Sequence, residues 1–171
     1  MENNKIYTCC FFGHRKINDS PELTERLIKA IENLIIEKEV NTFLFGSKSE
    51  FDRLCHKVVT GLKEKHPYIK RIYVRAAYAD IDDSYTKYLL ERYEETYYPE
   101  KMRGAGKASY VERNQEMINQ SNFCIVYYDE NYLPPRRKNS RRDLTDYQPK
   151  SGTKVAYDYA MKKGNEIINV M

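Results

Sequence analysis

Five short apolar runs alternate with amphipathic segments along this chain. The runs span residues 6–12, 41–45, 69–79, 123–128 and 167–170, and they are rich in β-branched and aromatic residues. Such runs predict strands, and their nearly continuous hydrophobic character favours strands that are covered on both faces, as in a parallel sheet. We therefore expect five strands in a mostly parallel sheet.

Helical periodicity occupies the stretches between these runs. Helices are predicted over five stretches, from Pro21 onward and at residues 50–65, 84–98, 109–119 and 152–163. Ser20 and Ser109 are predicted N-caps, the latter in a capping box with Glu112, and Gly164 suits the end of the last helix. This alternation predicts the α/β class and a Rossmann-like three-layer fold with helices on both faces of the sheet.

Composition indicates one self-sufficient domain that covers residues 1–171. Hydrophobic residues make up 41% of the chain and charged residues 32%, an ordinary balance for a globular protein. No apolar run approaches the ~20 residues of a membrane span, and the first residues lack the features of a secretory signal. We therefore expect a cytoplasmic protein without membrane contact, metal or cofactor, whose four cysteines are reduced and mostly buried.

Charge is nearly balanced overall but concentrated in one connection. The 29 Lys and Arg residues against 25 Asp and Glu give a formal net charge of +4, which does not by itself indicate nucleic acid as a partner. The long connection at residues 130–150 carries a basic run composed of Arg136, Arg137, Lys138, Arg141, Arg142 and Lys150. Such a run is usually a solvated loop, although it also suits a segment that gathers anionic ligands.

The predicted sheet brings several turns to one edge. In open parallel sheets, ligands bind beyond the carboxyl ends of the strands, near the point where the strand order reverses. The turns that follow three predicted strands lie at residues 13–16, 46–52 and 129–150, and the last helix starts at the same edge, at residues 151–154. We therefore expect a ligand-binding site along this edge.

Ser151, Gly152 and Thr153 open the last predicted helix. Free amides at a helix N-terminus favour anions, and glycine lets a ligand approach the backbone closely. We interpret this turn as a cradle for a phosphate or pyrophosphate group. The alternative is an ordinary turn in which Thr153 caps the final helix.

The turn after the first strand contributes Gly13, His14 and Arg15. The side chains of His14 and Arg15 can contact an anion or the edge of a base. A lone histidine is more often structural, and Arg15 also suits a surface ion pair, so both interpretations stay open. The position of the turn at the predicted ligand edge favours binding.

The turn after the second strand contributes Gly46 and Ser47, followed by Glu50 and Asp52 at the start of the next helix. Carboxylates in the first turn of a helix are also favoured by the helix dipole, without any further function. A binding role for Ser47 and Asp52, and a catalytic role for Glu50, are therefore weighed against simple stabilisation of the helix.

Residues elsewhere along the same edge complete the candidate set. Arg75 lies late in the third strand, and Arg113 with Asn114 starts the helix before the fourth strand. Arginine commonly binds phosphate or carboxylate through two parallel hydrogen bonds, but both arginines also suit exposed ion pairs. Tyr128 ends the fourth strand and Asp129 follows it. Most tyrosines of the chain are expected at half-buried surface positions, but Tyr127, Tyr128 and Tyr132 near this edge can also stack on a base.

Several short motifs occur together along the chain. They are Phe12-Gly13-His14-Arg15, Gly46-Ser47 with Glu50-Phe51-Asp52, Arg113-Asn114 with Met117, the run from Cys124 to Tyr128, and Ser151-Gly152-Thr153 with Ala156, Tyr159 and Ala160. In this order and spacing the chain resembles the SLOG superfamily, and most closely its YpsA-type branch, over nearly its whole length. The resemblance implies a Rossmann-like fold that binds nucleotides or their derivatives, such as the cyclic ADP-ribose-like signals sensed in bacterial antiphage systems.

The resemblance implies a class of ligand more than a reaction. The LOG phosphoribohydrolases of the superfamily release a base from a nucleoside monophosphate with an arginine, which Arg113 matches, and a glutamate, where this chain has Ala156. Hydrolysis of that type is therefore not implied directly. Glu50 is the candidate substitute acid or base for a glycosidic cleavage.

Three functional hypotheses follow from these residues. We expect first a protein that binds an ADP-ribose-like or nucleoside-phosphate ligand, as a sensor or by sequestering it. The alternatives are a nucleoside-phosphate N-glycosidase that uses Glu50, and a single-stranded DNA-binding protein of the DprA kind, which depends on the basic loop alone. Nucleic acid is otherwise not expected as a partner, whereas a homodimer is, because folds of this family often pair through helices.

Overall fold

A parallel sheet flanked by helices organises the residues that the structure, a computed structural model, describes (5–76, 83–100, 102, 107–134 and 151–171). The strands are β1 (Thr8–Gly13), β2 (Thr42–Phe45), β3 (Lys70–Val74), β4 (Glu95–Tyr97), β5 (Phe123–Tyr127) and β6 (Glu166–Asn169). The helices are α1 (Pro21–Glu37), α2 (Glu50–Lys63), α3 (Asp83–Leu90), α4 (Lys107–Asn119) and α5 (Gly152–Lys163). The strand order is β4-β3-β2-β1-β5-β6, and every pairing is parallel.

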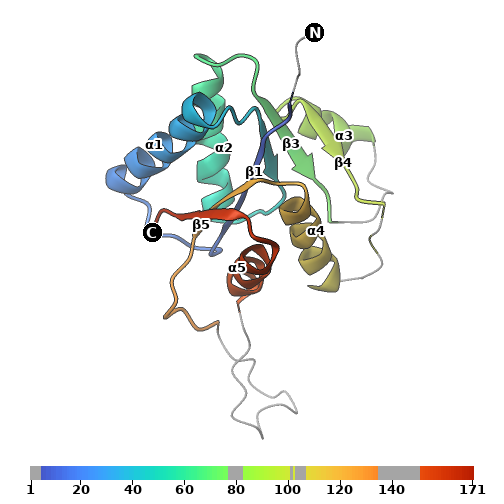
Figure 1. The fold of residues 1–171 in the computed structure, drawn as a ribbon. Coiled ribbons are helices and arrows are strands. Elements are labelled where there is room, and N and C mark those ends of the chain that lie inside the picture. The colour runs from blue at the N-terminus through green and yellow to red at the C-terminus, as the bar shows by residue number, and fades with distance from the viewer. Residues whose placement is uncertain (1–4, 77–82, 101, 103–106, 135–150) are drawn as a thin grey trace, which may run out of the picture.

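Helices cover both faces of the sheet (Figure 1). Successive side chains of a strand point to opposite faces, so each strand serves two hydrophobic clusters. Phe11 and Phe43 pack with α1 and α2, whereas their neighbours Cys10 and Leu44 pack with α4 and α5. These two clusters confirm the predicted α/β class and the Rossmann-like three-layer architecture.

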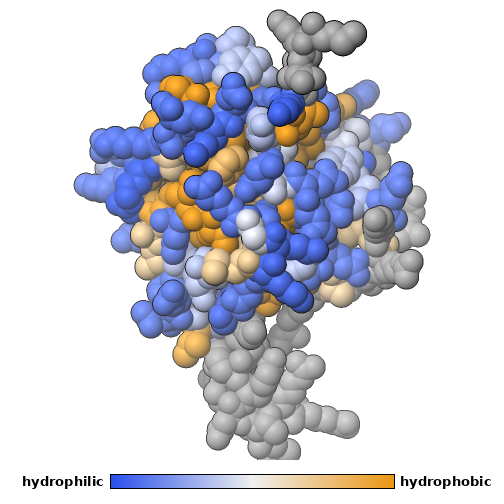
Figure 2. Space-filling model, in the orientation of Figure 1, coloured by the Kyte–Doolittle hydropathy of each residue, from blue (hydrophilic) through white to orange (hydrophobic). Residues whose placement is uncertain are grey.

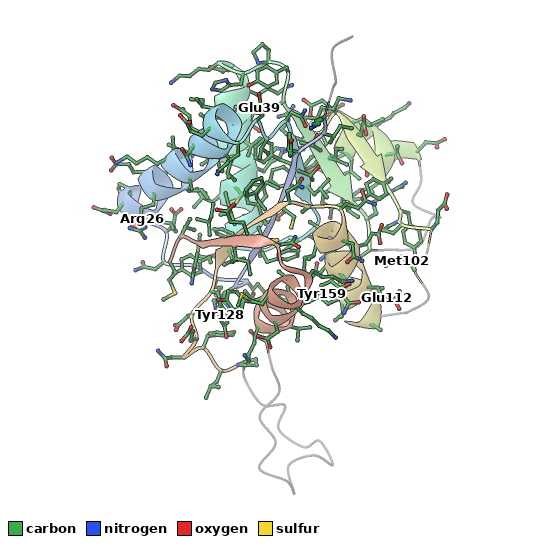
Figure 3. All side chains as sticks on the ribbon, viewed as in Figure 1. Arg26, Glu39, Met102, Glu112, Tyr128 and Tyr159 are labelled. Atoms are coloured by element: carbon green, nitrogen blue, oxygen red, sulfur yellow. The ribbon has the colours of Figure 1, made fainter. Side chains whose placement is uncertain are left out.

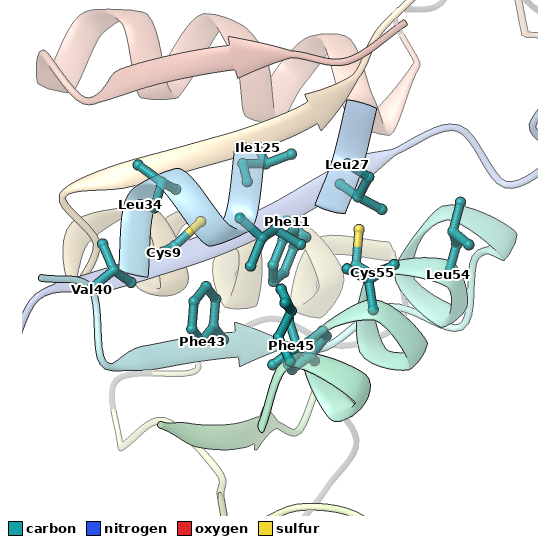
Figure 4. Close-up of a cluster of buried hydrophobic side chains, with 14 of the residues drawn as sticks. Cys9, Phe11, Leu27, Leu34, Val40, Phe43, Phe45, Leu54, Cys55 and Ile125 are labelled. Carbon is teal, nitrogen blue, oxygen red and sulfur yellow. The ribbon is translucent and has the colours of Figure 1, made fainter. Parts of the chain in front are cut away.

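Aromatic rings fill the centre of the larger cluster (Figure 4). The ring of Phe11 stacks on Phe43 and Phe45, with centroid distances of 6.0 and 5.0 Å. Burying one such side chain stabilises the fold by about 1.5–3 kcal/mol. Cys9 and Cys55 lie in the same cluster, and all four cysteines are buried and free, which confirms the prediction.

The strand order reverses between β1 and β5. Strands β2, β3 and β4 extend the sheet on one side of β1, while β5 and β6 extend it on the other. At the carboxyl ends, Gly13 pairs with Tyr127. A Cβ atom at Gly13 would collide with the ring of Phe51, so glycine is required for α2 to begin against the end of β1.

The sheet has six strands rather than the predicted five. The segment 84–98 was predicted as one helix, but α3 ends at Leu90 and β4 follows at Glu95–Tyr97. Glu94 donates its amide to Arg71 O at 2.9 Å, and its Oε2 accepts from Arg71 N at 2.8 Å, which fixes this segment beside β3. Pro99 also disfavours helical backbone at the residue before it. Tertiary pairing therefore outweighs the helical pattern here.

Strand β3 is shorter than predicted. The prediction ran from residue 69 to 79, whereas β3 spans Lys70–Val74. Its pairing with β2 ends at Tyr73 and its pairing with β4 at Val74, and among the described residues only the Arg75 amide continues the contact with β4, through Tyr97 O. Residues 77–79 of the predicted strand lie outside the described residues.

The start of α4 also differs from the prediction. Ser109 was predicted to be the N-cap of a capping box, but α4 begins two residues earlier, at Lys107. Lys107 and Ala108 are favourable helix formers, so the first turn extends through them. The capping box was wrong, and Ser109 is a buried residue within the helix.

Two other predicted helix ends are confirmed. Ser20 is the N-cap of α1, and its Oγ accepts a hydrogen bond from Leu23 N at 3.1 Å. Gly164 follows α5 in the left-handed conformation, with φ of 78°, which glycine adopts most easily.

Strand β6 forms one edge of the sheet, and hydrophobic surface is visible where it lies (Figure 2). Ile167 and Ile168 are half-buried there, and Met171 is exposed. Arg26 of α1 (Figure 3) donates through Nε to Val170 O at 3.0 Å, so this hydrogen bond links α1 to the residue that follows β6. Among the described helices, none is both long and apolar enough to cross a membrane.

Candidate functional site

His14 joins the ends of β1 and β5. Its Nε2 accepts a hydrogen bond from the backbone amide of Asp129 at 2.9 Å. A nitrogen that accepts carries no proton, so the ring is the neutral tautomer with its proton on Nδ1. Burial lowers the pKa of His14, and the charge of Asp129 opposes that effect. His14 therefore holds the loop after β5 at the point where the strand order reverses.

Aromatic rings surround His14. Tyr132 lies 4.3 Å from the His14 ring, centroid to centroid, and is 43% exposed. Tyr128 is buried and stacks on Tyr157 of α5 at 4.7 Å, so it lies beside that helix (Figure 3). Tyr132 is thus a ring that a ligand can reach, while Tyr128 supports the site from within.

The N-terminus of α5 is capped by Ser151. Its Oγ accepts from Lys154 N at 3.0 Å, so Ser151 rather than Thr153 is the N-cap. Thr153 is buried, whereas Gly152 is exposed, and a Cβ atom at Gly152 would meet nothing within 4 Å. Because the first amides of a helix lack partners within the helix, an anion can approach them over Gly152.

Arg113 crosses the end of β2. The side chain comes from α4, is 5% exposed, and donates through Nη1 to Gly46 O. Its Nε and Nη2 donate to Asn114 Oδ1 at 3.3 and 3.1 Å. A Cβ atom at Gly46 would lie 3.0 Å from Arg113 Nε and from Met117 Sδ, so glycine makes room for the arginine. Arg113 is therefore not the exposed arginine of the alternative interpretation.

Asp52 faces Arg113 from α2. It is 4% exposed, and its amide donates to the N-cap Ser49 Oγ at 3.1 Å. Burial raises the pKa of Asp52 to about 8, although the charge of Arg113 and backbone hydrogen bonds at Ser47 and Gly46 lower it. The carboxyl group therefore holds a proton at neutral pH.

Glu50 fixes the loop after β1. Its amide donates to Arg15 O, and its Oε2 accepts from Ile17 N, both at 2.9 Å. These two contacts give Glu50 a structural role at the start of α2. The catalytic role stays a prediction. Arg15 itself is exposed at this edge.

The predicted residues gather in two groups along the carboxyl edge. The β1–β5 group consists of Gly13, His14, Tyr128 and Asp129. The β2 group consists of Gly46, Ser47, Asp52, Arg113 and Asn114. Phe51, the neighbour of Asp52 in α2, packs against the β1–β5 side, because its ring borders Gly13 and lies 5.8 Å from that of Tyr127. Arg75 lies at the end of the neighbouring strand β3, where its amide donates to Tyr97 O at 2.8 Å.

Two tyrosines that interact with the β2 group were missing from the prediction. The Arg113 guanidinium lies 5.4 Å from the centroid of the Tyr110 ring, a cation–π contact. Tyr73 interacts electrostatically with both Arg113 and Asp52. Residues three apart in a helix are neighbours, so the spacing of Tyr110 and Arg113 carried this signal. The basic residues from Arg136 to Lys150 lie outside the described residues.

A groove of about 520 Å³ lies at the opposite edge of the sheet, where the strands begin. Its lining includes Tyr7, Ile36, Glu39, Asn41 and Tyr68 but none of the predicted site residues. Within the described ranges, no cluster of three or more His, Cys, Asp or Glu side chains is arranged to hold a metal ion.

The sequence matches no family model and no curated protein.

Proposed function

We propose that this protein binds a nucleotide-derived small molecule, an ADP-ribose-like or nucleoside-phosphate ligand, at the carboxyl edge of its sheet. The observation that carries the proposal is the reversal of strand order between β1 and β5. Ligands of open parallel α/β sheets bind outside the carboxyl ends of the strands at such a reversal. The resemblance of the sequence to SLOG proteins supports the same class of ligand.

The chemistry of this edge suits the parts of such a ligand. Gly152 is exposed at the N-terminus of α5, where backbone amides favour a phosphate. Tyr132 offers an exposed ring beside His14, and an aromatic ring is a suitable surface for a base. We infer that the protein holds its ligand as a sensor or by sequestering it.

Binding is the simpler proposal because the candidate catalytic residue is already engaged. The Glu50 carboxylate accepts the amide of Ile17, and this contact fixes a loop. The N-glycosidase alternative would require Glu50 to leave that contact. The predicted homodimer likewise stays a prediction.

A thermal-shift panel tests the proposal. The full chain is heated with ADP-ribose, cyclic ADP-ribose isomers, NAD, AMP and cyclic dinucleotides, and each compound is then recovered by chromatography. We expect at least one compound to raise the melting temperature and to be recovered intact. Recovery as free base and sugar phosphate would instead make the protein an enzyme.

Two variants of Gly152 locate the binding. Gly152→Asp adds a negative charge in open space at the first turn of α5, which favours the helix but repels an anion. Gly152→Ala is the neutral control, because it adds a small side chain at the same position without a charge. We expect Gly152→Asp to abolish the ligand-induced shift and Gly152→Ala to retain it. No shift with any compound of the panel would refute the nucleotide proposal.

A further inference from the structure

Three buried side-chain atoms have no hydrogen-bond partner within the described parts of the chain: Asp52 Oδ1, Arg75 Nε and Tyr97 Oη. An unpaired buried polar atom is unfavourable, so native proteins contain few of them. Asp52 follows β2, Arg75 follows β3 and Tyr97 ends β4. The unsatisfied atoms therefore all belong to the carboxyl ends of three neighbouring strands, the edge of the proposed ligand site.

Helix capping does not use the Asp52 carboxyl group. In a capping box, the third helical residue would accept the amide of the N-cap, here Ser49. The Ser49 amide instead donates to Ser47 Oγ at 2.9 Å. Ser49 Oγ accepts the amide of Asp52 at 3.1 Å, so half of the capping box is present and the other half is replaced. Asp52 Oδ1 is thereby left for another partner.

Arg113 faces this carboxyl group, and Arg75 follows the end of the neighbouring strand β3. Phe45 pairs with Tyr73 at the end of β2, so Ser47 and Arg75 both follow the ends of neighbouring parallel strands. Arg75 follows Tyr73 by two residues and so shares the sheet face that α2 covers, the face from which Asp52 comes. Arg113 reaches the end of β2 from α4, on the other face, through the space that Gly46 leaves.

Tyr97 belongs to a different environment. Its side chain packs with the cluster under α4 and α5. Burial raises the pKa of Tyr97 to about 12, and the charge of Glu116 in α4 adds to that effect. Tyr97 therefore points under α4 rather than toward Asp52, and we leave it out of the subsite.

We propose that Asp52, Arg75 and Arg113 form a subsite for the sugar phosphate of the ligand. A sugar hydroxyl bonds Asp52 Oδ1, and phosphate oxygens accept from the two guanidinium groups. A hydroxyl suits Asp52 because it can donate to a carboxylate oxygen or accept from a protonated one. This inference rests on the proposed function and adds a second phosphate contact, distinct from the N-terminus of α5.

Isothermal titration of the full chain with ribose 5-phosphate, ribose and inorganic phosphate tests the subsite. We expect ribose 5-phosphate to bind saturably at millimolar concentration and more tightly than either part alone. Asp52→Leu removes the polar atom, and Arg75→Gln removes the charge. Each should weaken ribose 5-phosphate binding by about tenfold or more, the loss expected for one good polar contact.

Two further variants make the test specific. Asp52→Asn retains an acceptor and a donor and should restore binding to near the wild-type affinity. Arg53→Gln removes a positive charge from an exposed neighbour on the same helix and should change nothing. Thermal melting checks that each variant folds. If Asp52→Leu does not fold, Arg75→Gln decides, because Arg75 is only half-buried.

The outcomes separate this subsite from the proposed function. Unchanged affinity in both Asp52→Leu and Arg75→Gln, or no saturable binding of ribose 5-phosphate to wild type, overturns the subsite. If the nucleotide panel still gives a shift that Gly152→Asp abolishes, the proposed function survives that result. If the panel gives no shift, the proposed function fails and the subsite fails with it.

Discussion

A carboxyl group near each edge of the sheet has a different set of partners. At the amino edge, Glu94 receives hydrogen bonds from Arg71 on both oxygens and lies 3.0 Å from Lys63. At the carboxyl edge, Asp52 is more deeply buried, yet one of its oxygens has no partner among the described residues. Arg113 donates to Gly46 and Asn114 instead.

The pKa values of Glu94 and Asp52 shift in opposite directions because their hydrogen-bond partners differ. Burial alone would raise the pKa of Glu94, but hydrogen bonds from Arg71 and Lys63 lower it to about 2. For Asp52 burial prevails, and its pKa rises to about 8. The amino edge is thus arranged for stability, whereas the carboxyl edge retains an unfavourable group. Such groups concentrate where a ligand supplies the missing partner.

The largest expected difference between the edges is a pH-dependent one. An Asp in the unfolded chain ionises near pH ~3.9, but Asp52 in the folded protein ionises only at about 8. Between these values the unfolded chain releases a proton that the folded protein keeps, so wild-type stability falls as pH rises. Asp52→Asn lacks this loss. The free energy of unfolding of Asp52→Asn, relative to that of wild type, should therefore rise by up to about 4 kcal/mol from about pH 5 to about pH 8.

Urea unfolding of both proteins at the two pH values measures this gain. Asp19→Asn, which changes an exposed aspartate before α1, is the control and should parallel wild type. A constant difference between Asp52→Asn and wild type at both pH values would mean that Asp52 is ionised throughout. The contrast between the two edges would then disappear.

Glu94→Gln should act in the opposite direction and with a smaller effect. The substitution keeps the shape but removes the charge that Arg71 and Lys63 share, which should cost about 1–2 kcal/mol at neutral pH because the group is partly exposed. The folded pKa of about 2 lies below the ordinary value. The stabilisation is therefore complete above about pH 4.5 and is lost as pH falls toward about 2.

The neighbouring residue provides a matched control. Glu95 pairs with Lys70 at 3.3 Å, but both side chains are more than half exposed. Glu95→Gln should therefore change the unfolding free energy by less than about 0.5 kcal/mol. Equal losses in Glu94→Gln and Glu95→Gln would show that the partly buried ion pairs of Glu94 contribute nothing beyond an ordinary surface pair.

Local patterns predicted most of the architecture. The apolar runs gave five of the strands, because a strand covered on both faces must be apolar nearly throughout. Strand β4 escaped prediction because Glu95–Tyr97 is stabilised by pairing with β3 and by the Glu94–Arg71 contacts, which are not local. The prediction of Ser109 as the N-cap of α4 was wrong for a related reason, since the capping-box pattern does not show how far the helix extends before it.

The location of the candidate site could be predicted from the sequence, but the contacts between its residues could not. Glycines after the strands indicated which edge to examine, and His14, Asp52 and Arg113 all lie there. That Arg113 is buried and crosses β2 depends on the missing side chain of Gly46 and on the packing of α4. That Glu50 fixes a loop depends on the path of the chain after β1. Sequence spacing encodes neither of these long-range contacts.

The smallest predicted effect concerns an exception at the amino edge. Glu39 turns the chain from α1 into β2 with φ of 56°, a left-handed conformation that is unfavourable for residues with a side chain.

Glu39→Gly should raise the free energy of unfolding by about 0.5–1 kcal/mol in urea titrations, because glycine adopts positive φ without strain. Lys38→Gly is the matched control, since Lys38 has φ of −108° and gains nothing from glycine. It should lose a similar amount through the added flexibility of the unfolded chain. Should both variants lose stability equally, the Glu39 side chain must contribute enough in its groove to offset the strain. The amino edge would then share with the carboxyl edge a residue that is retained for its contacts rather than for its backbone.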